Sequence, residues 1–250
     1  MNPNHTIEKM RAMRMKTMAE LYHQNLNGGL SAELSIDDFM TMLIEAEWEE
    51  RQSRRIARLI KQAGFKSQAT PTDIDYDPGR GLDKTQITRL LSLGFISRNE
   101  NIIITGPTGV GKSWLGQAIG GQACQMLIKT RYFGMARFFD QAKLARLEGS
   151  YPKFMKTLDK TPLLILDDFG LRPMDQTDRG LLLDLIDQRH GAASTILCSQ
   201  IPVSGWHQLI GEGTMADAIL DRVVYSSHRI ELKGESLRKK KTLELITPNP

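Results

Sequence analysis

The sequence predicts an α/β fold in which a parallel sheet of five strands is flanked by helices and is preceded by a small all-α domain. After residue 83, short apolar runs alternate with longer helical stretches, which is the pattern of βαβ units. Residues 1–66 show helical patterns only. Residues 67–82 hold two prolines, two glycines and three aspartates, as expected of a linker. We therefore divide the chain into a helical domain (1–66), a linker (67–82) and an α/β domain (83–250).

The helical domain is expected to contain two helices. The first should cover residues 7–24 and end at the Asn-Gly-Gly sequence that follows. The second should begin at Ser35, with two aspartates in its first turn, where carboxylates interact favourably with the helix dipole. It should continue to Ala63, with Gly64 as its C-terminal cap.

The α/β domain is expected to alternate strands and helices along its length. The expected strands are 101–105, 130–133, 161–166, 195–198 and 228–232. The expected helices are 112–128, 135–148, 176–190 and 213–226. Alternation of this kind predicts parallel strands with helices on both faces of the sheet.

The composition is that of an ordinary globular protein, with 40% hydrophobic and 25% charged residues. Neither a signal peptide nor an apolar run of about 18 residues is visible, so we expect a cytoplasmic protein without a membrane partner. Cys124 and Cys198 both lie in apolar patterns and should be buried core residues. The net charge of +4 favours an anionic partner only weakly.

The clearest motif is at residues 106–113, where GPTGVGKS matches the P-loop pattern G-x-x-x-x-G-K-[ST] between an apolar strand and a helix. Its glycines let backbone N–H groups surround phosphates at a helix N-terminus. Lys112 is expected to reach the β- and γ-phosphates of ATP, and the Ser113 hydroxyl to ligate Mg²⁺. The expected ATP-binding residues are Gly106, Pro107, Thr108, Gly109, Val110, Gly111, Lys112, Ser113 and Trp114.

A second motif combines an apolar strand with two acids. Asp167 follows four apolar residues, so it should lie at the carboxyl edge of the sheet and hold Mg²⁺ beside Ser113. Asp168 should orient or polarise the water that attacks the γ-phosphate. The alternative role for Asp168 is a turn residue before Gly170.

The order of strands in the sequence refines the class of nucleotide-binding protein. The expected strand 130–133 lies between the two motifs. A strand inserted between the P-loop strand and the strand that carries the acids is typical of AAA+ and RecA proteins, whereas kinases and GTPases place those two strands side by side. We therefore predict an AAA+ P-loop ATPase. Most AAA+ relatives have glutamate at the position of Asp168, so we expect slow hydrolysis. After Leu232 only 18 residues remain, so no C-terminal helical lid is expected.

Two further positions fit this AAA+ plan. Ser199 and Gln200 end an apolar strand, where a sensor of the γ-phosphate is expected, and the sequence does not separate the two. An ordinary strand-end turn is the alternative. Arg222 lies near the end of a helix, as an arginine finger acting on a neighbouring subunit would. Its alternative role is a surface salt bridge with Asp221 or Asp217.

Five stretches together resemble the IstB-like transposition helper ATPases, which are related to the DnaC-type helicase loaders. They are residues 80–84 (RGLDK), 106–113, 163–170, 221–222 and 234–238 (GESLR). The resemblance implies a protein that assembles with itself in the presence of ATP and binds duplex DNA with little sequence preference. It would then present target DNA to its partner transposase and stimulate it. It also implies that Arg238 lies near a nucleotide at a subunit interface.

Two groups of basic residues are candidates for contacts with DNA phosphates. One lies on an arc of the second predicted helix, beside an expected apolar face made by Trp48, Ile56, Leu59, Ile60 and Ala63. The other surrounds the strand at 130–133. Glutamates at 45–50 offer the alternative that the first group is a solvated, ion-paired helix face. The candidate residues are Arg51, Arg54, Arg55, Arg58, Lys61, Arg137, Lys143 and Arg146.

Two other functions share the same nucleotide motifs. A DnaC-type helicase loader would dock on a helicase and prefer single-stranded DNA, so competition between duplex and single strands distinguishes it. A scaffold that uses ATP as a structural switch would barely hydrolyse it, so turnover with and without DNA distinguishes that reading.

Overall fold

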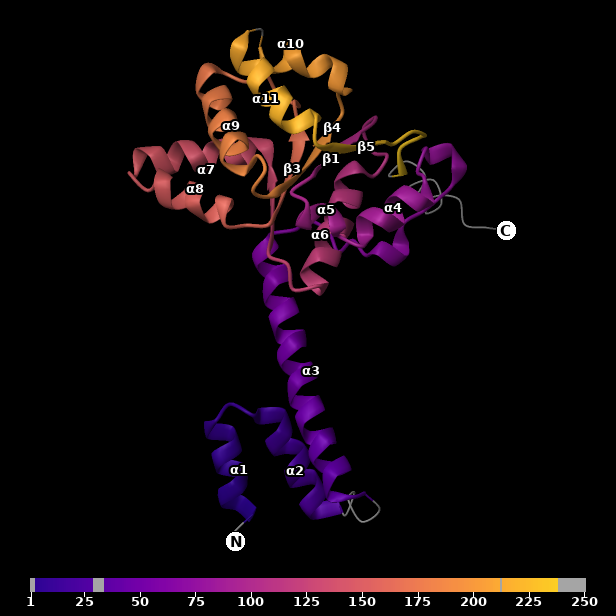
Figure 1. The fold of residues 1–250 in the computed structure, drawn as a ribbon, viewed down its shortest axis with the longest axis vertical. Helices are drawn as coiled ribbons and strands as arrows, with labels where there is room; N and C mark the ends of the chain where they lie inside the picture. Colours follow the sequence, from indigo (N-terminus) through magenta and orange to yellow (C-terminus); the bar gives the residue numbers. More distant parts are fainter. Residues whose placement is uncertain (1–2, 29–33, 212, 238–250) are drawn as a thin grey trace, which may run out of the picture. The chain divides into compact units, whose positions relative to one another are not determined.

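The computed structural model describes residues 3–28, 34–211 and 213–237. The chain divides into two compact units, Met1–Arg58 and Leu59–Pro250 (Figure 1). The boundary therefore lies inside the second predicted helix rather than at residue 66. Arg238 and the lysines that follow it lie outside the described residues. No helix in the described ranges is both long enough and apolar enough to cross a membrane.

The first unit contains three helices where two were expected. They are α1 (Pro3–Ala12), α2 (Lys16–Gly28) and the larger part of α3 (Ile36–Ala63). The predicted single helix over 7–24 is wrong because Arg14 adopts a left-handed backbone conformation with φ 61°, which interrupts it. The predicted second helix is confirmed, and Gly64, with φ 76°, ends it.

A small core holds the first unit together. It includes Ile7, Ala19 and Leu43, all of which are buried. The apolar face expected around Trp48 is largely solvent-exposed instead. The side chain of Trp48 is 63% exposed and that of Ile60 37% exposed, whereas Ala63 is buried.

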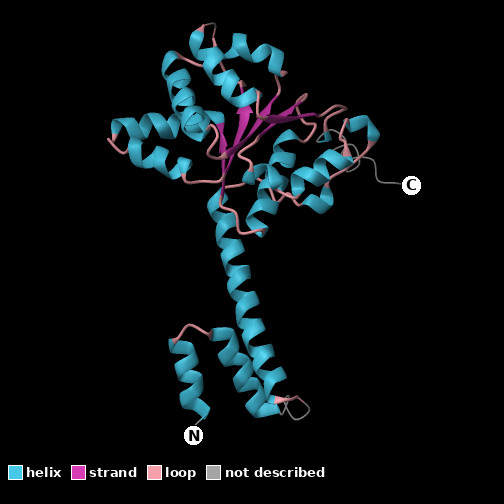
Figure 2. Ribbon diagram, viewed as in Figure 1, coloured by secondary structure: helices cyan, strands magenta, loops and turns pink. Residues whose placement is uncertain are grey.

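The second unit is built on one parallel sheet, shown in Figure 2, whose strand order is β2-β3-β4-β1-β5. All five predicted strands are present. Their bounds are β1 (Asn101–Thr105), β2 (Thr130–Gly134), β3 (Leu163–Phe169), β4 (Ser194–Ser199) and β5 (Ser227–Glu231). The strand that separates β1 from β3 in the sheet is β4. The strand at 130–133 is β2, and it forms the outer edge beside β3.

Two layers of helices cover the sheet, as Figure 1 shows, and each encloses an apolar core. The first layer is α7 (Met135–Leu147), α8 (Tyr151–Asp159), α9 (Gln176–Arg189), α10 (Trp206–Ile210) and α11 (Thr214–Val224). The other contains α4 (Lys84–Leu91), α5 (Gly94–Ser97) and α6 (Lys112–Gln125). The sequence did not predict α4, α5, α8 and α10, which are short. Cys124 and Cys198 are buried and unpaired, as expected.

The segment expected to be a linker, 67–82, is instead part of the second unit. It contains the short 3₁₀ helices η1 (Pro71–Asp73) and η2 (Pro78–Arg80). Ile74 is buried in the core around α6, and Tyr76 packs against the same core. The prolines and glycines that suggest a linker form these turns, and the apolar side chains between them fasten the segment to the domain.

Candidate nucleotide-binding site

The P-loop connects β1 to α6 at the carboxyl edge of the sheet. Gly106 and Gly109 have φ of 145° and 85°, which other residues rarely adopt. A Cβ atom at Gly106 would lie 2.3 Å from the carbonyl oxygen of Leu232, and one at Gly109 would lie 2.2 Å from Oγ of Ser236. The chain that follows β5 therefore packs directly on the loop, and glycine is needed at both positions.

Lys112 lies inside this loop. Its side chain is buried, and its Nζ donates a hydrogen bond to the carbonyl oxygen of Pro107 over 2.6 Å. Burial lowers the pKa of Lys112 below its usual value. Bound phosphate would stabilise the charged form, so this ammonium group is suited to an anionic ligand. Trp114, also expected at the site, is half-buried and packs against the core around α6.

The two sequence motifs meet through a hydrogen bond. Ser113 Oγ donates to Oδ1 of Asp167 over 2.8 Å, and the same oxygen accepts the backbone N–H of Asp168. The other carboxylate oxygen of Asp167 accepts the hydroxyl of Tyr132. Burial and the neighbouring Asp167 raise the pKa of Tyr132 well above its ordinary value, so its hydroxyl stays protonated and donates.

Hydroxyl and carboxylate oxygens are ligands that Mg²⁺ accepts, so Ser113 and Asp167 fit the predicted metal site. The described residues contain no group of three or more acidic, histidine or cysteine side chains that could hold a metal by themselves. In nucleotide-binding proteins, Mg²⁺ is usually held by one or two carboxylates together with the phosphates of the nucleotide.

Asp168 lies on an irregularity of β3. Between Leu166 and Phe169 this strand advances three residues, while its partner β4 advances two, from Leu197 to Ser199. One extra residue therefore bulges out, and bulges of this kind redirect side chains near active sites. Asp168 adopts φ 59°, a left-handed conformation that aspartate tolerates better than most residues. Asp168 also begins a turn, as its alternative role predicted, because its carbonyl accepts the N–H of Leu171.

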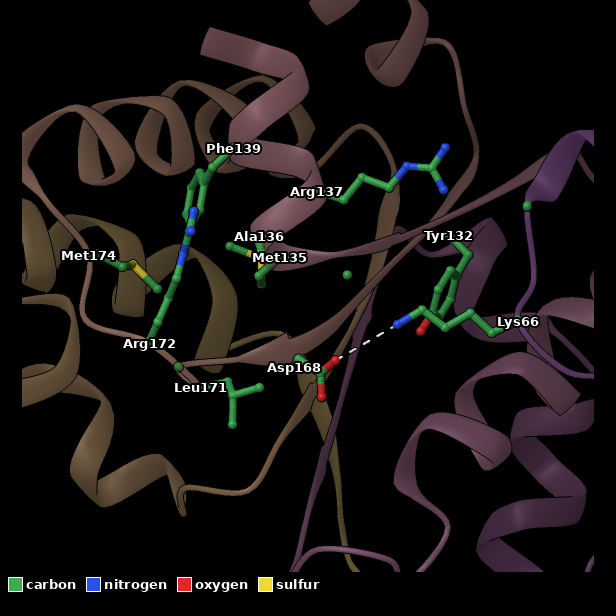
Figure 3. Close-up of a pocket in the computed structure, with 13 residues that line it drawn as sticks. Lys66, Tyr132, Met135, Ala136, Arg137, Phe139, Asp168, Leu171, Arg172 and Met174 are labelled. Carbon is green, nitrogen blue, oxygen red and sulfur yellow. Dashed lines mark ion pairs between the residues drawn. The ribbon is translucent and has the colours of Figure 1, made fainter. Parts of the chain in front are cut away.

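A pocket of about 240 Å³ opens beside Asp168, between β2 and the loop after β3 (Figure 3). Lys66 reaches across it, with Nζ 4.0 Å from Oδ2 of Asp168. Arg137 and Arg172 line the same pocket, and the guanidinium of Arg172 lies over the ring of Phe139, 5.9 Å from its centroid. Apolar side chains, among them Met135, Phe139 and Leu171, form much of the remaining lining, so Asp168 and the basic groups lie at the edge of a largely apolar pocket.

The two sensor candidates differ in their surroundings. Ser199 is fully buried, and its hydroxyl donates to the carbonyl of Phe169 and accepts the N–H of Ile201. It therefore shapes the end of the strand. Gln200 is exposed, and its Oε1 accepts the hydroxyl of Thr108 in the P-loop over 2.6 Å. Only Gln200 directs its side chain to the nucleotide loop.

Arg222 lies on α11 and forms an ion pair with Asp187 of α9, at 2.9 Å. Its guanidinium also donates to the carbonyl of Ala218. Arg222 therefore does form a salt bridge, as its alternative role predicted, but its partner is Asp187. Asp217, one of the expected partners, pairs with His207 instead. Within the described ranges, neither of these two side-chain contacts of Arg222 involves the P-loop of its own chain.

The candidate DNA-binding residues fall into two classes. Four are already paired: Arg51 with Glu47, Arg54 with Glu50, Lys143 with Asp175 and Asp178, and Arg146 with Asp184. The others form no ion pair with any described residue: Arg55, Arg58, Lys61 and Arg137. The pairs of Arg54 and Arg146 are exposed and therefore weak, so these two can exchange partners at little cost, whereas Arg51 and Lys143 pair with the buried carboxylates of Glu47 and Asp178.

Several residues near the site were missed by the sequence analysis. Arg80 donates to the carbonyl of Val110 over 2.8 Å and so braces the P-loop. Gln117 is buried in α6 and donates to the carbonyl of Ser113. Tyr132 and Lys66 contact the two acids. Gln117 carries a weak signal as a glutamine in an apolar helix, whereas the other three reach the site only through the tertiary fold.

Comparison with known proteins agrees with this geometry. A family model described as IstB-like ATP binding protein matches residues 8–245. An insertion sequence ATP-binding protein of Sinorhizobium fredii is 42% identical over 234 residues, covering 94% of this chain and 96% of that protein. The insertion sequence IS21 ATP-binding protein of Pseudomonas aeruginosa is 30% identical over 240 residues, covering 94% and 91%.

Solved structures with a similar fold include a helicase loader and a DnaA protein. The DnaC helicase loader has a TM-score of 0.52 at 21% identity, covering 60% of this chain and 87% of its own. AMPPCP-bound DnaA from Aquifex aeolicus has a TM-score of 0.59 at 19% identity, covering 74% and 57%. These likenesses show the fold, and the sequence relatives show the family. The chain therefore belongs to the IstB-like ATP-binding proteins of insertion sequences and is an ATPase with the AAA+ fold.

Proposed function

We propose that this ATPase binds ATP with Mg²⁺, assembles with copies of itself on duplex DNA, and in that form directs and stimulates a partner transposase. The observation that carries the proposal is the hydrogen bond from Ser113 to Asp167, which joins the phosphate-binding loop to the acidic strand. The pocket beside Asp168 lies next to this junction.

In the proposed mechanism, backbone N–H groups of residues 106–113 and the ammonium of Lys112 hold the β- and γ-phosphates. Ser113 and Asp167 would hold Mg²⁺, which when bound would neutralise the negative charge that develops on the phosphates. Asp168 orients the attacking water and accepts its proton. Gln200 reports the state of the γ-phosphate to the P-loop through Thr108. Ser199 keeps a structural role at the end of β4.

Arg222 is proposed to complete the site of a neighbouring subunit. Its ion pair with Asp187 is at the surface, where exchange for a phosphate oxygen costs little. Arginine suits this exchange because its charge is permanent and its planar fork matches phosphate oxygens. Arg238 is proposed to lie near the same interface, on the resemblance alone.

The proposed DNA contacts come from the basic side chains of α3, with Arg55 and Arg58 as the first candidates because they have no acidic partner among the described residues. Arg137, Lys143 and Arg146 are the second group. A few contacts in one subunit give weak binding with a salt slope of about −0.9 per phosphate. Several subunits aligned on one duplex multiply those contacts through effective concentration.

The test is a duplex-length series measured by fluorescence anisotropy with ATP and with ADP, at two salt concentrations. We expect long duplexes to bind far more tightly with ATP than with ADP, and duplexes that hold one subunit to show little nucleotide dependence. Lys112→Ala should lose ATP binding and with it the effect of length. An affinity that ignores both length and nucleotide would contradict the proposal.

Two further arms identify the partners. Arg55→Glu with Arg58→Glu should weaken binding equally on unrelated sequences and flatten the salt slope, whereas the same reversal at Lys153 and Lys156 of α8 is the control. Preference for single-stranded over duplex DNA would favour the helicase-loader alternative. The similarity in fold to the DnaC helicase loader is the reason to test it. Transposition assays with and without ATP test the transposase partner.

A further inference from the structure

The four residues that follow α3, 64–67, contact the nucleotide site through the backbone. The backbone N–H groups of Lys66 and Ser67 both donate to Oε1 of Gln117, over 2.6 and 3.0 Å. Gln117 is buried, and its Nε2 donates to the carbonyl of Ser113 over 2.9 Å. One glutamine side chain therefore joins the end of α3 to the first turn of α6, where the P-loop serine lies.

The same segment contacts the acidic strand through side chains. The ring of Phe65 packs edge-on against the ring of Tyr132, with centroids 6.5 Å apart. Lys66 Nζ lies over that ring, 5.6 Å from its centroid, and extends toward Asp168, as Figure 3 shows. The hydroxyl of Tyr132 then donates to Asp167. Tyr132 thus stands between the segment after α3 and the carboxylate of Asp167.

The hydrogen bond from Tyr132 matters because Asp167 is buried and has few other donors. Asp167 is 3% exposed, and its Oδ1 already accepts two donors, from Ser113 and from its neighbour's backbone. The hydroxyl of Tyr132 is the donor to Oδ2. A buried carboxylate that loses one donor rotates or draws on another partner, and either response moves the oxygen that faces a ligand.

We propose that Tyr132 is a positioning residue for Asp167, and that Phe65 and Lys66 hold Tyr132 in place, so that the segment leading out of α3 sets the geometry of the Mg²⁺ site. The inference rests on the proposed function, in which Asp167 holds Mg²⁺.

The first test is a Mg²⁺ titration of the affinity for a fluorescent ATP analogue, on the full chain. Tyr132→Phe keeps the ring and removes the hydroxyl. We expect unchanged affinity in excess EDTA, and a Mg²⁺ requirement raised about tenfold, at the lower end of what loss of an outer-shell partner typically costs. Tyr151→Phe is the matched control. Tyr151 also donates a hydrogen bond to an aspartate, Asp184, but it lies on α8, far from the P-loop in sequence.

The second test asks whether Phe65 acts through Tyr132. Phe65→Leu should raise the Mg²⁺ requirement in the wild-type background and have no further effect when combined with Tyr132→Phe. Additive effects would mean that Phe65 contributes independently of Tyr132, which would overturn that part of the inference. Thermal unfolding of each variant verifies that the fold is intact.

The outcomes separate this inference from the proposed function. If Asp167→Asn raises the Mg²⁺ requirement while Tyr132→Phe titrates as wild type, the metal site stands and the positioning role of Tyr132 is overturned. If Asp167→Asn also titrates as wild type, the proposed metal site itself fails. A raised requirement for Asp167→Asn and Tyr132→Phe, but not for Tyr151→Phe, supports both.

Discussion

Asp167 and Asp168 are adjacent residues with different environments. Asp167 continues the inward side of β3, is buried, and accepts hydrogen bonds from three donors. Asp168 is the residue of the bulge, adopts a left-handed backbone and reaches into an open pocket. Aspartate tolerates this backbone better than glutamate does, which gives a physical reason for the shorter acid at this position.

A single substitution tests the catalytic role of Asp168. Asp168→Asn preserves size and tolerance of the left-handed backbone but cannot accept a proton. We expect ATP affinity to stay within a few-fold and hydrolysis to fall by about 10²–10⁴, the usual contribution of a general base. Single-turnover hydrolysis and equilibrium nucleotide binding measure the two effects separately. Asp159→Asn, at an exposed position on α8, is the control. Near-normal turnover would leave Asp168 with its turn role alone.

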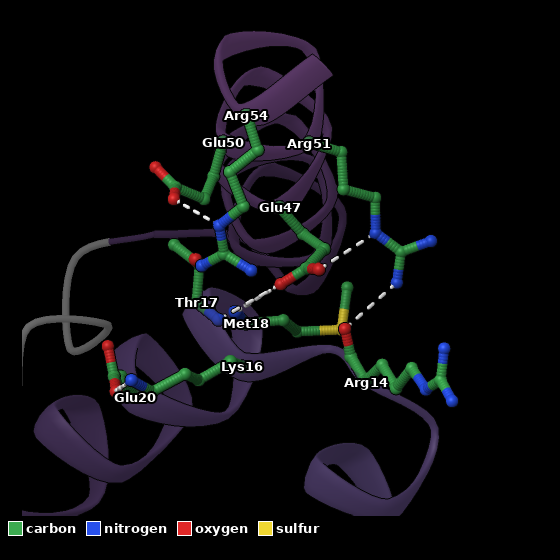
Figure 4. Close-up of polar contacts among 9 residues, drawn as sticks. All are labelled: Arg14, Lys16, Thr17, Met18, Glu20, Glu47, Glu50, Arg51 and Arg54. Carbon is green, nitrogen blue, oxygen red and sulfur yellow. Dashed lines mark hydrogen bonds and ion pairs between the residues drawn. The ribbon is translucent and has the colours of Figure 1, made fainter. Parts of the chain in front are cut away.

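At the scale of elements, the first unit depends on a carboxylate of α3 that caps another helix (Figure 4). Glu47 is buried, and its Oε2 accepts the backbone N–H groups of Thr17 and Met18 at the start of α2. Its Oε1 accepts the guanidinium of Arg51, which also donates to the carbonyl of Arg14. Burial alone would raise the pKa of Glu47, but the bonds from Arg51 and from the backbone lower it overall. The Glu47–Arg51 pair therefore has a structural function in addition to any role in binding phosphates.

Removing this cap should loosen α2. Glu47→Ala leaves two backbone donors at the start of α2 without their partner. A hydrogen bond to a charged group typically contributes about 1.5–3 kcal/mol to stability. We expect faster amide hydrogen exchange over residues 16–28, measured by mass spectrometry on the full chain. Exchange in the second unit should not change. Glu49→Ala, at an exposed position of α3, is the control, and equal exchange in both variants would refute the capping role.

The edge strand β5 is fastened by a second carboxylate. Glu100, just before β1, accepts hydrogen bonds from Arg98 and lies 2.8 Å from Nε2 of His228 in β5. The bonds from Arg98 and from His228 lower the pKa of Glu100 to about 2. A carboxyl whose pKa is lower in the folded state stabilises the fold above its ordinary pKa and loses that contribution as pH falls.

The stability of the second unit should therefore depend on Glu100 in acid. We expect the wild type to be more stable than Glu100→Gln at pH 5, and the difference to shrink as pH falls from about 4.5 toward 2. Urea unfolding at a series of pH values measures it. Glu148→Gln removes an exposed carboxylate that has no ion pair among the described residues, so it is the control. A difference that is constant with pH would exclude the linkage.

At the scale of the whole molecule, each subunit is expected to hold an incomplete hydrolysis site. The P-loop, Asp167 and Asp168 lie together at the carboxyl edge of the sheet, whereas Arg222 pairs with Asp187 in the layer of α9 and α11. The proposed role of Arg222 in hydrolysis is therefore one that acts on a second subunit. The same assembly would supply the many DNA contacts that one subunit lacks.

Mixing two inactive proteins tests this arrangement. Arg222→Ala should bind ATP but hydrolyse it slowly, since an arginine finger typically contributes about 10³–10⁵ in rate. Lys112→Ala should fail to bind ATP while keeping Arg222. We expect the mixture to recover part of the wild-type turnover at sites shared between the two variants. Asp187→Ala, which frees Arg222 from its partner, should not lower turnover. A mixture that stays inactive while both variants co-assemble would exclude action between subunits.

What the sequence determined by itself follows from local rules. The five strands, the long helix α3 with its glycine cap, the P-loop and the acidic pair are each set by residues adjacent in the chain, because hydrophobic periodicity, turn-forming residues and motif spacing act locally. The break at Arg14 and the short helices escaped prediction, because propensity decides weakly over so few residues.

The tertiary structure alone decided which distant residues share a site. Only the parallel pairing of β2 with β3 brings Tyr132 to Asp167, and only the folding of residues 64–82 onto the sheet brings Lys66 and Arg80 to the two motifs. It also separated Gln200 from Ser199, because one side chain turns to Thr108 and the other into the core. These relations depend on contacts between residues far apart in the chain, and such contacts are determined by packing over the whole domain rather than by any local pattern.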